Sequence, residues 1–482
     1  MRDLEPRQAC ASPPGNGVAV ISIRDVLEGA QGTLHGEASP DLMFNEVCHD
    51  SRQVTPGDLF VAIVGENFDG HGFVEDAIAN GAAAALVASH RIDELREFNL
   101  PLIAVDDTVQ ALQRLATHWR ALFDVTVVGI TGSIGKSSNK EVIASVLSQR
   151  FSVVKARASF NNEIGMPLTI MEINPDTKVA VLEFGGAYRF GEITELSEIA
   201  RPTIGVVTNV SHSHLQRMGS LEAIAETKAE LPRSLPSDGL AVLNGDDFRV
   251  RAMADETQAR VVFYGLAPDC EVRARNVESH GLEGISFTLD MDGEEQHLNV
   301  PLIGAHSVHT VLAAIAVGRE LGMGLDHMIP GFEDATIQLR LLTLPGINQS
   351  TIIDDTYNAN PTSCLAALNL LSELDASRKV AVLGDILELG DFEDEGHRIV
   401  GRRAASVVQQ LVSVGPKARI ITEAALESGM REDQVIAFEQ KAEAMEQLPS
   451  IIQPGDFVLV KWSRGVNMEE VVEAVRDRSR PA

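Results

Sequence analysis

Cysteine is scarce in this chain, and no two cysteines have the C-x-x-C spacing. The four residues are Cys10, Cys48, Cys270 and Cys364. Cysteines this scattered argue against a disulfide framework and against a structural zinc site. They are typical of reduced thiols, and we therefore expect a cytoplasmic protein.

Long apolar runs are also missing. The longest runs, such as residues 82–88, are far too short to cross a bilayer. The first 20 residues contain acidic residues and prolines but no apolar core of a signal peptide. We expect no membrane insertion, and we expect residues 1–17 to form a disordered polar leader.

Basic residues are outnumbered, with 40 Lys and Arg against 69 Asp and Glu and a formal net charge of −29 at pH 7. Nucleic acids and anionic membranes bind to basic faces, so this balance argues against both as partners. A phosphorylated ligand would need a locally basic site, for which Lys136, Arg52 and Arg340 are the candidates.

Short β-like runs alternate with helical segments along most of the 482 residues, and this pattern predicts an α/β fold with about three domains. We place the domains at 18–122, 123–332 and 333–482. The expected strands are 18–23, 59–63, 84–87, 102–105, 125–130, 179–183, 204–208, 240–243, 350–354, 379–383, 411–414 and 457–460.

A glycine-rich loop follows the apolar run 125–128, and residues 129–137 read Gly-Ile-Thr-Gly-Ser-Ile-Gly-Lys-Ser. Its backbone N–H groups, the Lys136 ammonium and the Ser137 hydroxyl suit a triphosphate and its Mg²⁺. Ile130 occupies the position where the Walker A motif has its first glycine. A helix is expected from about Lys140. Since no N-K-x-D stretch is present to bind guanine, ATP is the expected nucleotide.

Polar residues follow the next strands of the middle domain. Glu183 ends one strand, at the sheet edge where open α/β sheets bind ligands, and is a candidate Mg²⁺ ligand. Asn209 and His214 follow another strand and are expected at the same edge. Lys228 lies on a later helix, where periodicity alone predicts an ordinary solvated charge.

The third domain has three polar strand ends. Residues 354–361 combine two acids, two amides and a proline, which is typical of a binding loop. Residues 384–390 and 461–465 follow two further strands. Together these loops predict a second site at a sheet edge.

Taken in order, from about residue 18 to 475, these motifs resemble the Mur ligase family of ATP-dependent amide ligases, in particular its member that uses D-alanyl-D-alanine. Loop 131–137 has the family's spacing, which accounts for the displaced glycine. The segments 159–168 and 355–361 are the most specific signals. The resemblance implies a small N-terminal α/β substrate domain, a central P-loop ATPase domain with a mostly parallel sheet, and a C-terminal, Rossmann-like doubly wound domain.

The resemblance also implies roles for the matching residues. The catalytic and metal-binding residues would be Lys136, Ser137, Glu183, His214 and Lys228, with Lys228 carbamylated. The nucleotide would be bound by Thr131, Gly132, Ser133, Gly135, Lys136, Ser137, Ser138, Asn162, Ser307, Thr310, Arg340 and Asp355. The other substrates would be bound by Ser51, Arg52, Asn358, Asn360, Asp385, Glu388, Lys461, Ser463 and Arg464.

The implied activity is an ADP-forming ligase of peptidoglycan precursor synthesis. It would join D-alanyl-D-alanine to UDP-N-acetylmuramoyl-tripeptide through an acyl phosphate, with ATP and Mg²⁺ as cofactors and small molecules as its partners. We expect the protein to be a monomer in the cytoplasm.

Two segments depart from the family pattern. Residues 304–310 read Gly-Ala-His-Ser-Val-His-Thr where the family has Gly-x-His-Asn-x-x-Asn, and Trp462 replaces a glycine beside the expected acceptor site. A related ligase that joins another acid–amine pair, in secondary metabolism or in a folylpolyglutamate-like reaction, is therefore an alternative. A third hypothesis is a nucleotide-gated binding or scaffold protein without catalysis.

Overall fold

The computed structural model describes residues 20–65, 68–157, 160–186, 189–334, 337–338, 341–463 and 469–480. The predicted leader at 1–17 lies outside the described residues, as do Arg340 and Arg464. Contacts divide the chain into two compact units. The first contains Met1–Gly129, Arg150–Gly185 and Ile193–Ile204, and the second contains Ile130–Gln149, Gly186–Glu192 and Gly205–Ala482.

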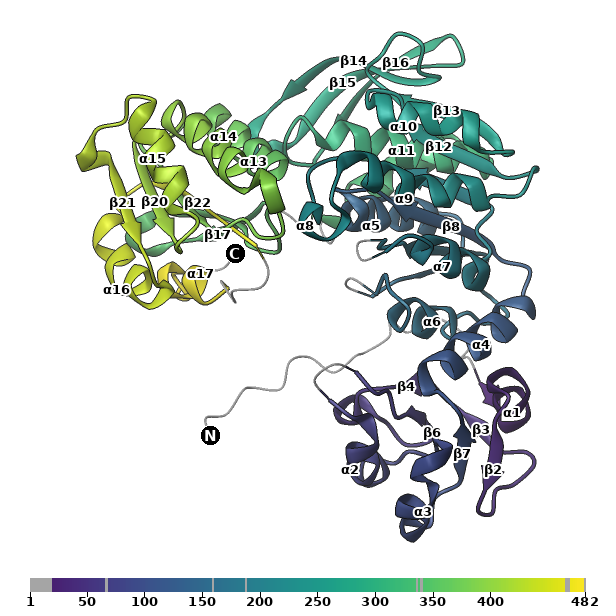
Figure 1. The fold of residues 1–482 in the computed structure, drawn as a ribbon. Helices are drawn as coiled ribbons and strands as arrows, with labels where there is room; N and C mark the ends of the chain where they lie inside the picture. Colours follow the sequence, from purple (N-terminus) through teal and green to yellow (C-terminus); the bar gives the residue numbers. More distant parts are fainter. Residues whose placement is uncertain are drawn as a thin grey trace. The chain divides into compact units, whose positions relative to one another are not determined.

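The first unit contains a five-stranded sheet in the order β2-β7-β6-β5-β4 (Figure 1). Its strands are β2 (Thr33–His35), β4 (Val47–Cys48), β5 (Leu59–Val61), β6 (Ala84–Ala88) and β7 (Leu102–Val105). All pairings are parallel except that of β2 with β7. The helices of this region are α1 (Ile23–Ala30), α2 (Val74–Ala79), α3 (Ile92–Leu95) and α4 (Thr108–Ala121).

The strand predicted at 18–23 is only partly confirmed, and residues 18 and 19 lie outside the described residues. Ile21 and Ser22 form β1, in a short antiparallel pair with β3 (Met43–Phe44), and α1 begins at Ile23. Ser22 caps this helix by accepting a hydrogen bond from the Asp25 backbone N–H at 3.1 Å. A serine N-cap with an acidic residue in the first turn starts a helix, and here this local signal prevails over the β-branched residues before it.

A nine-stranded sheet has the order β16-β15-β14-β13-β12-β11-β8-β10-β9. Its strands are β8 (Thr126–Thr131), β9 (Val153–Lys155), β10 (Val179–Glu183), β11 (Ile204–Val207), β12 (Leu240–Asn244), β13 (Arg260–Gly265), β14 (Val272–Ser279), β15 (Ile285–Met291) and β16 (Glu294–Val300). The last three form an antiparallel extension, whereas β12, β13 and β14 pair in parallel.

Helices accompany this sheet. They are α5 (Lys136–Ser148), α6 (Gly165–Ile170), α7 (Glu192–Ala200), α8 (Leu215–Met218), α9 (Leu221–Ser234), α10 (Phe248–Ala252), α11 (Ser307–Glu320) and α12 (Leu325–Phe332). The helix predicted from Lys140 begins four residues earlier, immediately after Gly135. Every residue of 139–147 is buried, so α5 is a core helix and is not amphipathic.

The second unit also contains a six-stranded sheet in the order β17-β18-β22-β19-β20-β21. Its strands are β17 (Leu342–Pro345), β18 (Thr351–Asp355), β19 (Lys379–Gly384), β20 (Gln410–Val414), β21 (Val435–Phe438) and β22 (Phe457–Lys461). The helices are α13 (Pro361–Glu373), α14 (Glu393–Ala405), α15 (Arg419–Glu427), α16 (Lys441–Ile451) and α17 (Glu469–Val475). Only β17 pairs antiparallel with its neighbour.

The two faces of the six-stranded sheet are separate hydrophobic cores. Ile353 and Leu459 belong to the core that contains α13, α14 and α15, whereas Ile352 and Val458 belong to the core with α16 and α17. This alternation follows from the two-residue period of a strand. Apolar strands buried on both faces are the signature of a doubly wound sheet, so the α/β prediction is confirmed.

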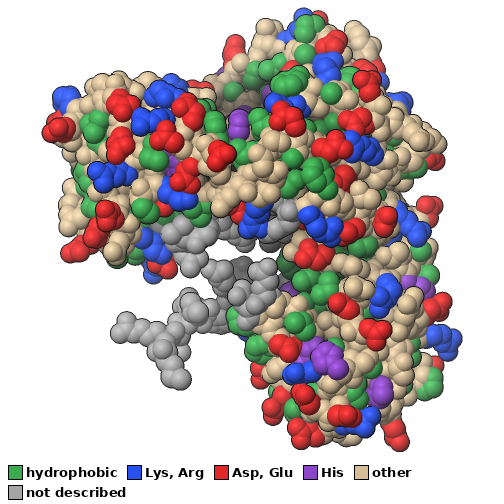
Figure 2. All heavy atoms as spheres, in the orientation of Figure 1, with side chains coloured by type: hydrophobic (Ala, Val, Ile, Leu, Met, Phe, Trp, Pro, Cys, Tyr) green, Lys and Arg blue, Asp and Glu red, His purple; other side chains and the backbone are tan. Residues whose placement is uncertain are grey.

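Acidic and basic side chains are interspersed on the face shown in Figure 2. Within the part of the chain that the structure describes, no helix is long and apolar enough to cross a membrane.

Candidate functional site

The glycine loop between β8 and α5 has a backbone that requires its glycines. Gly132 has φ +140° and Gly135 has φ +84°, in the region that L-residues rarely adopt. A Cβ atom on Gly132 would overlap the Thr208 hydroxyl. The loop therefore leaves the first backbone N–H groups of α5 pointing away from the helix body, which is a general site for anions.

The end of β11 clamps this loop. The Asn209 side chain accepts a hydrogen bond from the Ile134 backbone N–H and donates one to the Ile134 carbonyl, both at 3.0 Å. The Thr208 hydroxyl donates to the same carbonyl at 2.6 Å. The sequence predicted Asn209 at this edge of the sheet but gave it no function. In the structure, the Asn209 side chain holds the glycine loop in place.

Lys136, the first residue of α5, extends its side chain back over the loop. Its ammonium donates to the Gly132 carbonyl at 2.8 Å. Ser137 follows in the first turn and is buried. Glycines without a Cβ, helix-start N–H groups and a lysine charge over the loop form a donor set that fits a polyphosphate.

Glu183 ends β10, as predicted, and is almost fully buried. Its Oε1 atom accepts a hydrogen bond from the Asn161 amide at 2.9 Å. The sequence offered no signal for this partner beyond its place in the asparagine-rich segment 159–168. A buried carboxylate held by a neutral amide keeps its second oxygen in a defined direction.

Lys228 on α9 is only 3% exposed, so the prediction of an ordinary solvated charge from helix periodicity is wrong. Its Nζ donates to the Gly186 carbonyl at 2.7 Å.

His214 precedes α8 in a left-handed conformation with φ +56°. Its Nδ1 lies 2.5 Å from Oε2 of Glu388, which the sequence had assigned to the acceptor site. Burial and the nearby Lys136 charge lower the pKa of His214, while Glu388 acts in the opposite direction.

The strand ends of the six-stranded sheet come together as predicted. The Lys461 ammonium pairs with the Asp355 carboxylate at 2.5 Å, and it also donates to the Asn358 carbonyl at 2.9 Å. The side chains of Lys461 and Asp355 are 1% and 7% exposed. Ser463 joins two of the loops, because its hydroxyl accepts from the Leu387 N–H at 2.9 Å and donates to the Ala359 carbonyl at 3.3 Å.

Two predicted substrate-binding side chains have local partners. Oδ1 of Asp385 accepts from the backbone N–H groups of Lys417 and Ala418, at 3.0 and 2.7 Å. Asn360 is the N-cap of α13 and accepts from the Ser363 N–H at 2.9 Å. These side chains hold the backbone of the loops in which they lie.

The Trp462 ring is buried and packs against Gly384 at the start of loop 384–390; we call the strand-end loops 354–361, 384–390 and 461–465 the acceptor loops. Trp462 is 2% exposed and belongs to the core with α16 and α17. Lys461 and Ser463 contact the loops, and since neighbouring residues of an extended chain point to opposite faces, the indole between them points into the core. A Cβ on Gly384 would overlap its ring.

The two hydroxyls expected to replace the family's asparagines have protein partners. Ser307 donates to the Ile303 carbonyl at 2.7 Å, and the Thr310 hydroxyl accepts from the Asn139 amide at 3.4 Å. Asn139 was not among the predicted site residues.

In the N-terminal region, Ser51 is buried while the Arg52 side chain is 87% exposed. The Arg52 guanidinium pairs with Asp50 at 2.7 Å, and this hydrogen bond lowers the pKa of Asp50. A guanidinium that is exposed in this way is accessible to a phosphate group of a ligand.

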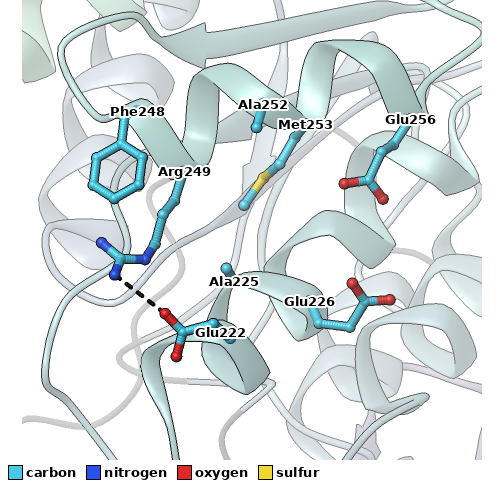
Figure 3. A pocket seen from close by; sticks show the side chains of 8 residues that line it. All are labelled: Glu222, Ala225, Glu226, Phe248, Arg249, Ala252, Met253 and Glu256. Atoms are coloured by element: carbon cyan, nitrogen blue, oxygen red, sulfur yellow. Dashed lines mark hydrogen bonds and ion pairs between the residues drawn. The ribbon is translucent and has the colours of Figure 1, made fainter.

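A surface pocket of about 290 Å³ lies between α9 and the segment 248–256. Figure 3 shows Phe248, Arg249 and Glu222 at its rim, with Arg249 and Glu222 joined by a hydrogen bond. Helix α9 contributes Glu222, Ala225 and Glu226 to its lining. The predicted site residues do not line this pocket.

Comparisons with known proteins cover nearly the whole chain. Residues 44–120 match a model described as Mur ligase family, catalytic domain; residues 130–318 match the Mur ligase middle domain; and residues 340–464 match the Mur ligase, glutamate ligase domain. A UDP-N-acetylmuramoyl-tripeptide–D-alanyl-D-alanine ligase of Escherichia coli (strain K12) is 35% identical over 468 residues, which cover 95% of this chain and 98% of that protein. The chain belongs to the Mur ligase family.

Other members of the Mur ligase family are similarly close. The ligase of the same description from Bacillus subtilis (strain 168) is 34% identical over 94% of this chain and 97% of its own. A crystal structure of MurF from Acinetobacter baumannii superposes with a TM-score of 0.83, at 30% identity, covering 94% of this chain and 98% of that chain. MurF from Thermotoga maritima in complex with ADP gives a TM-score of 0.74, at 28% identity, covering 89% and 96%. The three-domain Mur ligase architecture predicted from the sequence is therefore confirmed.

Proposed function

We propose that this chain is an ATP-dependent, ADP-forming ligase that joins D-alanyl-D-alanine to UDP-N-acetylmuramoyl-tripeptide. The proposal rests on the glycine loop, which is held by Thr208 and Asn209 and covered by Lys136. Ligases of that activity match this chain over 94–95% of its length. The acceptor loops supply the second half of such a reaction.

The reaction has two steps. The terminal carboxylate of the tripeptide attacks the γ-phosphorus of ATP and forms an acyl phosphate, with ADP as the leaving group. The amine of the dipeptide then attacks the acyl carbon, and the tetrahedral intermediate collapses to the amide with loss of phosphate and a proton. Lys136 and the N–H groups of the loop offset charge on the transferring phosphoryl group, and no covalent protein intermediate is required.

For the nucleotide, we propose that the phosphates are surrounded by the glycine loop, through Thr131, Gly132, Ser133, Gly135, Lys136, Ser137 and Ser138. Further contacts would come from Asn162, Ser307, Thr310, Arg340 and Asp355. The partners of Ser307 and Thr310 make these two the weakest of the set. Lys461, which is held by Asp355, connects the nucleotide residues to the acceptor loops.

For the metal, we propose Ser137, Glu183, His214 and Lys228 as ligands of Mg²⁺, an ion that neutralises phosphate charge when bound. Hydroxyl and carboxylate oxygens fit this hard cation. No group of three or more His, Cys, Asp or Glu that could hold a metal occurs among the described residues. With Lys228 as a carbamate, the proposed set gains a further oxygen donor.

For the other substrates, we propose that Ser51 and Arg52 bind the UDP end of the donor. Asn358, Asn360, Asp385, Glu388, Lys461, Ser463 and Arg464 are the proposed acceptor residues, either through their side chains or through the loops that they hold. We place the domain boundaries after residues 17, 122 and 332, and we propose a cytoplasmic monomer.

The test is release of ADP by the purified chain supplied with UDP-N-acetylmuramoyl-tripeptide, ATP and D-alanyl-D-alanine. We expect one ADP for each amide formed, and no amide without ATP. A panel of other acids and amines serves as the comparison. Turnover with another pair only would favour the alternative ligase, and nucleotide binding without any turnover would favour the scaffold hypothesis.

A further inference from the structure

Glu388 makes three contacts with one short segment, 214–217, that precedes and begins α8. Its Oε2 receives the His214 Nδ1 contact at 2.5 Å, and its Oε1 lies 3.1 Å from Nη2 of Arg217. Its backbone carbonyl accepts a hydrogen bond from the Gln216 N–H at 3.0 Å. We call these four residues the 388 clasp.

The 388 clasp joins two regions that match different domains of the family. Residues 214–217 lie in the middle-domain match, and Glu388 lies in the glutamate ligase match. All four belong to the second contact unit. A second contact supports the clasp, because the rings of His212 and Phe392 stack with their centroids 4.0 Å apart.

The backbone around the clasp is held in an uncommon conformation. Both His214 (φ +56°) and Glu388 (φ +63°) occupy the left-handed region, which is unfavourable for a residue with a Cβ. Gly390 also has a positive φ, and a Cβ at that position would lie 3.1 Å from the Gln216 Cα. Strain of this kind persists where surrounding contacts over-determine a geometry, which is common at functional sites.

We infer that Glu388 is a positioning residue for His214. A carboxylate only accepts, so Nδ1 of His214 carries the hydrogen and Nε2 is the lone-pair nitrogen. Histidines that bind metals commonly donate their other N–H to a carboxylate, which fixes both the tautomer and the ring orientation. The inference rests on the proposed function, because it assigns Nε2 to the proposed metal site.

The clasp also links the histidine to the acceptor loops. Leu387, which precedes Glu388, donates its N–H to Ser463 at 2.9 Å. Docking of the glutamate ligase region on segment 214–217 therefore orients His214, while the same loop shapes the acceptor site. In this way the phosphoryl-transfer site is completed only when the region that delivers the amine is in place.

The test compares Glu388→Ala, Glu388→Gln and Asp391→Ala in the full-length protein. Asp391 is the matched control, since it lies in the same loop, is exposed, and makes no side-chain hydrogen bond or ion pair within the described residues. The tautomer of His214 is read from its ¹⁵N imidazole signals, assigned by their loss in His214→Gln. Affinity for Mn²⁺ is measured by electron paramagnetic resonance with a non-hydrolysable ATP analogue bound.

We expect Glu388→Ala to mix the two tautomers of His214 and to weaken Mn²⁺ binding by about 10–100-fold. Glu388→Gln keeps an acceptor oxygen and should restore most of both. Asp391→Ala should match the wild type. If Glu388→Ala also matches the wild type in tautomer and Mn²⁺ affinity, the inference is overturned, whatever the ligase assay gives.

The two proposals fail in different ways. A wild-type protein that makes no amide while Glu388→Ala still changes the tautomer would refute the proposed function and support the clasp. A wild-type protein that makes amide while all three variants keep the tautomer and the Mn²⁺ affinity would refute the clasp and leave the function intact.

Discussion

The burial of Trp462 predicts that this residue determines stability and not the choice of acceptor amine. The perturbations are Trp462→Phe, Trp462→Ala and Gly384→Ala. The matched neighbour is Ser463→Ala, because Ser463 contacts the acceptor loops while the Trp462 ring packs in the core on the other face.

The magnitudes follow from the packing. The indole is 2% exposed, and truncating a buried tryptophan to alanine costs about 3–5 kcal/mol through lost burial and the resulting cavity. The indole Nε1 has no hydrogen-bond partner among the described residues, and an unpaired buried donor costs about 1–3 kcal/mol. Phenylalanine removes that donor and keeps most of the ring, so Trp462→Phe should stay within about 2 kcal/mol of the wild type.

Gly384→Ala places a methyl group into overlap with Cε3 and Cδ2 of the Trp462 ring, and 2.8 Å from the Trp462 Cβ atom. Overpacking of this kind costs about 1–3 kcal/mol. In a Trp462→Ala background the ring contacts are gone while the Cβ atom of residue 462 remains, so the same change should cost less than in the wild type. The double-mutant cycle therefore measures the contact directly.

The assays are urea unfolding for stability and steady-state kinetics for the KM of D-alanyl-D-alanine. We expect Trp462→Phe to leave this KM within about twofold, whereas Ser463→Ala raises it or lowers kcat with a stability loss of about 1 kcal/mol. The reasoning is refuted if Trp462→Phe changes acceptor preference at unchanged stability, or if Gly384→Ala costs the same in both backgrounds.

Three further predictions concern the loop, its clamp and a buried acid. Lys136→Ala should lower kcat by on the order of 10³-fold or more with an unchanged unfolding curve, and normal turnover would contradict the assigned role. Asn209→Ala removes both hydrogen bonds to Ile134 and should weaken ATP binding about tenfold by calorimetry; unchanged affinity would show that the loop is rigid without it. Burial raises the pKa of Glu172 to about 7 from an unfolded value of 4.5, so its stabilising contribution is present below pH 4.5 and is lost as the pH rises through 7. Because its side chain is 32% exposed, Glu172→Gln should gain only roughly 1–2 kcal/mol at pH 8 and nothing at pH 4 in thermal unfolding, and equal gains at both values would refute this assignment.

Local patterns placed the strands that they predicted well, but they missed others, including β9, β13 to β17 and β21. Strands 59–61, 84–88, 102–105 and 379–384 lie within one or two residues of their predicted bounds, because buried parallel strands are short apolar runs bounded by polar turns. The failures also have local causes. The first predicted strand ends at Ser22, because this residue caps a helix that begins at Ile23. Helix α5 begins at Lys136, because a glycine loop can enter a helix directly.

Some residues of the candidate site could be predicted from the sequence, whereas their partners could not. The glycine loop and the polar strand ends were visible in the sequence, since parallel strands bring their carboxyl ends to one edge of a sheet. The partners of these residues were not visible. Asn209 holds Ile134 from 75 positions away, and Glu388 meets His214 from 174 positions away.

The sequence by itself therefore determined the family, the expected nucleotide and the order of the motifs, because these depend on residue types at fixed spacing. Only the tertiary structure decided which side chains are buried and which distant residues they contact. It buried Lys228, turned Trp462 into the core and brought Glu388 into contact with His214. These outcomes depend on how distant segments pack, and packing is a property of the folded chain that no local pattern contains.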